Sequence, residues 1–271
     1  ESLILSKVAT GDMKAALQIS DTFVKRGATS QMVHLLSIAK AVKANDFDSV
    51  LVQLDSQKDV GHFLVNGLIK GWARAGSGKI DAAFAQFDEL AGDTGLASFG
   101  KFHKALLNMV IGDYKSASRI LADLHKSSGQ TTVRGMRIRI QALMMQGEFG
   151  KADALFKKSF GSEPSLQLLS LENDLKAKRQ PQALLIAEPR DGIAEIFFSV
   201  AQILSSEQND DYTLVHARLA EYLLRESAEA TLLSAEVLSK MEQFDLATRA
   251  FAQINPDDAL FRTAQIGRAD A

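Results

Sequence analysis

The sequence contains no cysteine and only four prolines. The absence of cysteine excludes disulfides, thiolate metal sites and cysteine nucleophiles. It leaves the compartment open, because a protein without thiols tolerates either redox environment. Scarce proline, together with abundant Ala, Leu, Lys, Glu and Gln, favours helix over strand by intrinsic propensity. The composition therefore favours an all-helical chain.

The sequence also lacks a strong net charge and a long apolar run. The formal charge is -2 over 271 residues, and no run of Lys and Arg is present, so we expect no nucleic-acid partner. No apolar stretch approaches the roughly 18 residues that a membrane helix needs, so we expect no membrane insertion. With 46% hydrophobic and 24% charged residues, the composition is that of a folded protein and not of a disordered one.

Motifs that carry catalysis or bind metals are missing. The histidines never fall at positions i and i+4, as they do in a zinc-binding helix. Gly76–Lys79 resembles the end of a phosphate-binding loop, but Ala73 stands where that motif needs Gly and Ile80 where it needs a hydroxyl. Ser37 and Ser98 each precede a Lys by three residues, as in one hydrolase class, but the companion motifs are absent. We therefore predict no enzyme activity, no metal and no cofactor.

A repeat of 33 to 35 residues runs through much of the chain. Each copy has a small or polar corner residue, a second polar residue, a large apolar residue and, three positions later, a small residue. Such corners lie at Gly11, Asn45, Gly78, Gly112, Gly147 and Glu242. Apolar residues between the corners follow helical spacing. Each copy is thus predicted to be two helices, the first ending in the left-handed conformation that Gly adopts without strain.

This pattern resembles the tetratricopeptide repeat (TPR) family, whose unit has 34 residues. The family places an aromatic residue two positions after the corner and Ala three positions later, as in Tyr114 and Ala117. The fullest match combines Phe244, Ala247 and Phe251. The resemblance implies an all-α fold, an α-α superhelix: a right-handed solenoid of about eight TPR-like helix pairs, one of them degenerate.

The repeats divide the chain into two regions of one continuous solenoid. Residues 1–178 are predicted to form N-terminal TPR-like repeats, and residues 179–271 a degenerate repeat followed by C-terminal TPR-like repeats. Residues 257–271 read as the first helix of a further unit, so we expect the natural protein to continue beyond them.

Residues 179–224 fit the repeat worst. We expect a weak corner at Arg179, a short second helix after Pro181, a turn from Pro189 to Gly192 and another turn at 208–211. This irregularity is either a joint between two stacks or sequence drift.

In the TPR family the first helix of each unit lines a concave face that binds peptides or helices of other proteins. The resemblance places the following candidates for partner binding on that face: Leu68, Trp72, Phe102, Leu106, Arg137 and Gln141. His103 and Arg139 are further candidates for the groove; the alternatives are a partly buried, hydrogen-bonded histidine and an arginine on a solvated helix face. Because most of these residues are apolar, the groove would suit a hydrophobic peptide, a partner helix or other segments of the same protein.

We therefore predict a non-catalytic protein-protein interaction scaffold that binds a peptide or partner protein on its concave face. The alternative is the recruiting or regulatory repeat region of a larger enzyme, or of a secretion or envelope assembly factor. Exposed terminal helices would also allow a homo-oligomer. The chain is similar to bacterial TPR proteins predicted to be exported, and it has neither cysteine nor an initiator Met, which favours a periplasmic over a cytoplasmic location.

Overall fold

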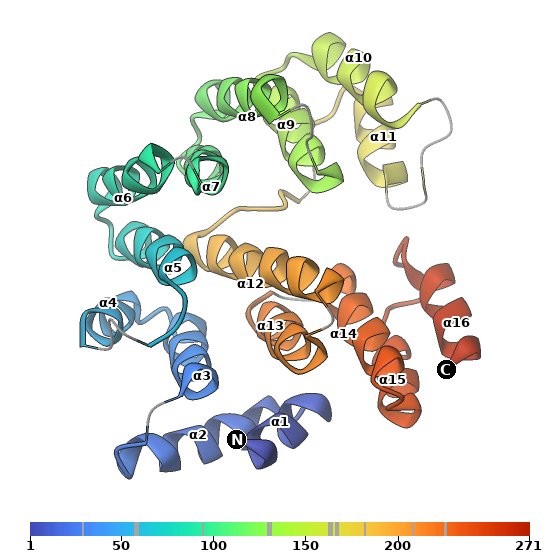
Figure 1. Cartoon of the computed structure of the whole chain (residues 1–271). Helices are drawn as coiled ribbons and strands as arrows, with labels where there is room; N and C mark the ends of the chain where they lie inside the picture. Colours follow the sequence, from blue (N-terminus) through green and yellow to red (C-terminus); the bar gives the residue numbers. More distant parts are fainter. Residues whose placement is uncertain are drawn as a thin grey trace.

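The computed structural model describes residues 1–28, 30–56, 60–93, 95–128, 132–161, 165, 168–181, 183–207, 209–224 and 227–271. Within these residues the chain is all-α, with sixteen helices and no strand (Figure 1). None of the helices in this described part is long and apolar enough to cross a membrane.

The first eleven helices pack largely in chain order and form an open arc (Figure 1). Their bounds are α1 Ser2–Ala9, α2 Met13–Lys25, α3 Gln31–Lys43, α4 Phe47–Ser56, α5 Phe63–Gly76, α6 Ile80–Gly92, α7 Ala97–Val110, α8 Tyr114–Ser128, α9 Val133–Met145, α10 Phe149–Phe160 and α11 Leu169–Lys176. The remaining helices are α12 Pro189–Ser206, α13 Asp210–Leu223, α14 Ala228–Lys240, α15 Phe244–Phe251 and α16 Phe261–Asp270.

The predicted corners are confirmed. Every one of them has a positive φ, from 75° to 82° at the glycines, 57° at Asn45 and 59° at Glu242. At Gly78, for example, the amide of the next residue, Lys79, donates to the Arg74 carbonyl at 2.8 Å, which satisfies a carbonyl left over at the helix end. The following helix begins two residues after each corner, as the repeat predicts.

The small residue of each repeat is buried at the contact between its two helices. The positions concerned are all 0% exposed: Ala16, Val50, Ala83, Ala117, Ala152 and Ala247. A small side chain allows close approach there, where a larger one would collide with the neighbouring helix. Repeat spacing in the sequence thus becomes helix-pair packing in the fold.

Helices α12 and α13 lie inside the arc instead of extending its end. α12 packs on α5 and α7 and also touches α3, and α13 packs on α1 and α3. Figure 1 shows both helices enclosed by α1–α11. One hydrophobic core therefore joins side chains of the arc, such as Trp72, with Ile193 and Phe197 of α12. If the helix pairs continued to stack along a single axis, α12 and α13 would not contact helices as far back in the chain as α1, α3 and α5.

The predicted details of residues 179–192 are wrong. The corner is Lys178, with φ 49°, and the described residues from 179 to 188 form no helix after it. Pro181 contributes to this, because proline has no N–H to donate in a helix. Pro189 is not in a turn but is the first residue of α12, a position that suits its fixed φ.

Farther along, the expectations agree better with the structure. α13 begins at Asp210, within the turn predicted at 208–211, although Gln208 lies outside the described residues. The helix predicted in the last segment is α16, Phe261–Asp270.

Candidate interaction surface

The middle of the concave groove is filled by α12. Trp72 of α5 has no exposed surface, and a Cβ atom added at Gly192 of α12 would lie only 2.1 Å from its indole ring. Glycine is therefore needed for this close approach. Leu68 and Leu106 are 2% and 0% exposed. A partner could reach Trp72 only if α12 moved away.

Trp72 and His103 form a buried polar contact within this core. The indole Nε1–H of Trp72 donates to Nδ1 of His103 at 2.9 Å. Phe87 packs edge-on against the indole, with ring centroids 5.6 Å apart. Burial lowers the pKa of His103 to about 3. The imidazole is thus neutral near pH 7, as an acceptor at Nδ1 must be.

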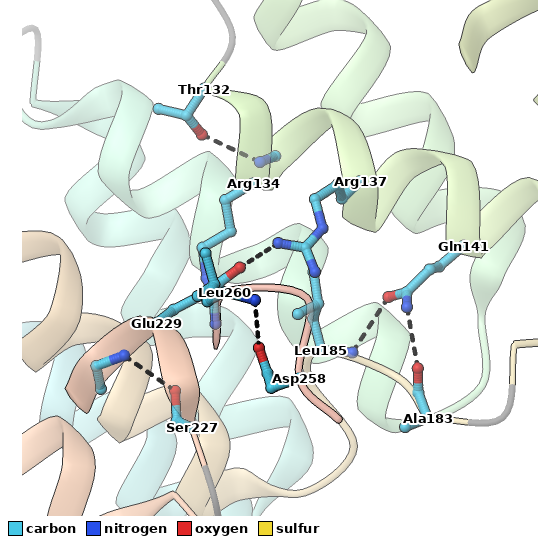
Figure 2. Close-up of polar contacts among 12 residues, drawn as sticks. Thr132, Arg134, Arg137, Gln141, Ala183, Leu185, Ser227, Glu229, Asp258 and Leu260 are labelled. Atoms are coloured by element: carbon cyan, nitrogen blue, oxygen red, sulfur yellow. Dashed lines mark hydrogen bonds and ion pairs between the residues drawn. The ribbon is translucent and has the colours of Figure 1, made fainter. Parts of the chain in front are cut away.

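A network of ion pairs connects α9 of the arc to α12 and α14. Nε of Arg134 on α9 donates to Glu195 of α12 at 2.6 Å, and Arg134 also pairs with Glu229 of α14. Arg137 donates to the same Glu229, as Figure 2 shows. The predicted partner-binding residue Arg137 is therefore engaged within its own chain.

Burial shifts the pKa values of both Arg134 and Glu195. It raises the pKa of Glu195, and Arg134 opposes that rise by its charge and hydrogen bond. Burial alone would lower the pKa of Arg134, but Glu195 and Glu229 hold it above its usual value. Such a buried pair is costly to break, because either charge left alone would be unsolvated.

Gln141 holds an extended segment of the same chain. Its Nε2 donates to the Ala183 carbonyl at 3.0 Å, and its Oε1 accepts from the Leu185 amide at 3.1 Å (Figure 2). The side chain is buried, at 6% exposed. This is the way a groove residue would hold a bound peptide, and here the peptide is the connection between α11 and α12.

An unfilled part of the groove forms a cleft of about 1430 Å³ between the C-terminal half of α12 and helices α5 and α7–α10, here called the α12 cleft. Val133 and Ile203 line it while 57% and 43% exposed. Phe102 also lines it and is partly exposed. The cleft is larger than the roughly 300–1,000 Å³ typical of small-molecule sites. Its size and apolar lining therefore suit a segment of a protein.

The charged side chains along the α12 cleft are mainly basic. Lys126, Arg139 and Lys158 line it together with Arg134. Among its described lining residues the only carboxylate is Glu195, which is already bound to Arg134. The cleft thus differs from the chain as a whole, whose formal charge is -2.

A second cleft, of about 1080 Å³, lies between α9, α11, the α11–α12 connection and the start of α16. Its charged lining residues are largely paired with one another. Arg179 donates to Asp174 at 2.5 Å, and Arg190 pairs with Glu188. These internal pairs make the second cleft a weaker candidate for binding.

No metal centre accompanies these clefts within the described residues, where no group of three or more His, Asp or Glu side chains could hold a metal ion.

The sequence pattern singled out Arg139 but missed Val133, Val200 and Ile203 of the α12 cleft. A signal was nevertheless present in α12. From Gly192 to Phe198 every residue is buried, with apolar side chains on all sides of the helix except at Glu195. A helix that is apolar all round belongs in an interior and not in an outer layer. That pattern identifies α12 as an enclosed helix.

Helix pairs joined at left-handed corners and packed on their chain neighbours define an all-α, TPR-like helical-repeat fold. No protein-family model matches the chain, and no curated protein matches it. Among solved structures, the chain is similar to a structure of Naa15/Naa10 bound to HypK-THB, with 15% identity and a TM-score of 0.33. The match covers 99% of this chain and 38% of that one, so this chain spans less than half of the length of the matched chain.

Proposed function

We propose that the chain is a non-catalytic protein-interaction scaffold that binds a segment of a partner protein in the α12 cleft. The observation that carries this proposal is the exposure of Val133 and Ile203 toward a cleft of about 1430 Å³. Large apolar side chains gathered at a hollow mark binding sites on folded proteins. Of the residues predicted from the sequence, Leu68 and Phe102 line this cleft, and the partly exposed Phe102 would contact the partner.

The other predicted residues have supporting roles in this proposal. Trp72 packs on Gly192 of α12, Leu106 is buried in the same core, and Arg137 and Gln141 hold α14 and the α11–α12 connection. Together they keep the cleft in shape without touching the partner. A preformed site of this kind loses less entropy on binding than one that must first be ordered.

Site-specific photo-crosslinking in cells of the native host tests the proposal. A photoreactive benzoylphenylalanine would replace Ile203 in one variant and Val52 in another. Val52 is the matched control, because it is 68% exposed and lies outside both clefts.

We expect a defined protein to be crosslinked from position 203 and not from position 52. Equal crosslinking from both positions, or none from position 203, would place the binding surface elsewhere. Mass spectrometry of the crosslinked band would identify the partner and would also show whether it is an enzyme recruited by the scaffold.

A further inference from the structure

The groove already binds one helix, its own α12. That helix lies against α5 and α7 through apolar side chains. Arg134 of the neighbouring α9 meets it with a hydrogen bond of 2.6 Å to Glu195. The groove thus recognises a helix by apolar contact combined with an arginine–carboxylate pair.

Arg139 offers a second arginine of α9 to the same groove. It lines the α12 cleft, and its Nε atom is buried with no hydrogen-bond partner. Among the described residues no carboxylate lies within ion-pair distance of it. Burial lowers its pKa, and the charge of Asp123 only partly opposes this. An Nε–H that has lost water without gaining an acceptor is unfavourable, so a carboxylate placed beside this partly buried guanidinium would be bound well.

The other cations of the cleft add positive charge to that of Arg139. Lys158 is exposed at its edge, and no described carboxylate pairs with it. Lys126 meets Asp123 at 3.9 Å, with side chains 79% and 67% exposed, which is a weak pair. An incoming segment with negative charge would therefore be attracted and aligned.

We propose that the α12 cleft binds an amphipathic, acidic helix of a partner protein. The apolar stripe of this helix packs on Phe102, Val133 and Ile203, and one of its carboxylates pairs with Arg139. The proposal rests on the proposed function and specifies the chemistry of its partner. A helix is favoured over an extended peptide because the adjoining part of the groove is filled by a helix, whereas Gln141 already holds the extended segment of this chain.

A phage-displayed library of random 16-residue peptides, selected on the full chain, provides the probe. The enriched sequences are synthesised with a fluorescent label, and the Kd of each is measured by anisotropy. We expect apolar residues at positions i, i+3 or i+4, and i+7, with Asp or Glu beside them. Circular dichroism should show that the bound peptides are helical.

Variants of the chain then test the acidic partner separately from the proposed function of the α12 cleft. Arg139→Gln should raise the Kd by about tenfold or more, the loss expected for a charge-assisted hydrogen bond. Arg139→Glu should bind a peptide in which Lys replaces the critical carboxylate. Arg119→Gln is the matched control, because Arg119 is exposed on α8 outside the cleft, and it should leave the Kd unchanged.

The possible results point to different conclusions. If Ile203→Ser abolishes binding but Arg139→Gln does not change it, the acidic partner is wrong while the proposed function stands. If neither variant affects the selected peptides, or if no binder is recovered, both proposals fail. Binders rich in Pro without helical spacing, or dimerisation of the chain that Ile203→Ser prevents, would also overturn the helical partner.

Discussion

The indole Nε1–H of Trp72 donates a hydrogen bond of 2.9 Å to Nδ1 of His103, and both side chains are buried between the arc and α12. This acceptor must stay unprotonated for the bond to exist. The contact therefore links the docking of α12 to pH.

The first prediction is a loss of stability in acid. The pKa of His103 is about 3 in the folded chain and 6.5 as an ordinary value. Below pH 6.5 the unfolded chain binds a proton there and the folded chain does not, so stability falls as the pH drops. Between pH 6.5 and 4.5 this group alone should remove about 2–3 kcal/mol from the free energy of unfolding.

His103→Gln tests this, because glutamine keeps an acceptor for Trp72 but does not titrate. Urea unfolding at both pH values should show a smaller difference for the variant than for the wild-type chain. His216, whose pKa burial also lowers, should keep part of the acid sensitivity in both proteins. If the free energy of unfolding changed equally with pH in the variant and in the wild-type chain, His103 would not be the titrating group.

The second prediction concerns the contact between α5 and α12. Gly192→Ala places a Cβ atom 2.1 Å from the ring of Trp72, which has no room to move. Overpacking of this kind should destabilise the chain by about 1–3 kcal/mol. Trp72 is the only tryptophan, so its fluorescence reports directly on whether α12 stays docked.

Gly150→Ala is the control for this experiment. Nothing lies within 4 Å of a Cβ atom added at Gly150, and the residue is in α10. Alanine should stabilise the helix there by a few tenths to about 1 kcal/mol without changing the fluorescence. The close α12 contact would be refuted by a Gly192→Ala variant as stable as the wild type.

A third prediction concerns the buried ion pair. Arg134→Met leaves Glu195, whose side chain is 2% exposed, without its partner. We expect a loss of about 3–5 kcal/mol in urea unfolding, because an unpaired charge remains in the interior. Adding Glu195→Leu to Arg134→Met should recover most of the lost stability. Failure of the double variant to recover stability would show that the pair supports the fold by more than charge compensation.

The fourth prediction tests the repeat packing. Ala117 is 0% exposed at the contact between α7 and α8, so Ala117→Glu should cost about 3 kcal/mol or more. Ala154→Glu is the control, because Ala154 is exposed on α10. Its glutamate would stand four residues before Lys158, a favourable helix pair. Similar thermal stability of both variants would argue against the proposed position of Ala117 in the repeat.

The local structure could be predicted well from the sequence. Gly78 and Gly112 mark corners because only a few residue types tolerate a left-handed φ, and Asn45 serves at the same position. Ala117 marks a helix contact because of its size. These are short-range constraints, so they are recorded within a single repeat.

The position of α12 could not be predicted in the same way. Pro189 was expected in a turn, although proline suits the first residue of a helix equally well. The pairing of Arg134 with Glu195 joins residues 61 positions apart, and no repeat spacing records it. The complete burial of Trp72 and Leu106 was visible only in the structure. The periplasmic location stays a prediction.

The enclosure of α12 and α13 by the arc also affects how the chain folds during its synthesis. In an open repeat protein each unit contacts only its neighbours, so folding can begin in the part of the chain that is already synthesised. Here Lys43 of α3 donates to the carbonyl of Tyr222 in α13, 179 residues later. At ordinary rates of translation the groove of α3 and α5 would stay uncovered for on the order of ten seconds. Until α12 and α13 are synthesised, the apolar side chains of α3 and α5 that they cover would remain exposed to water.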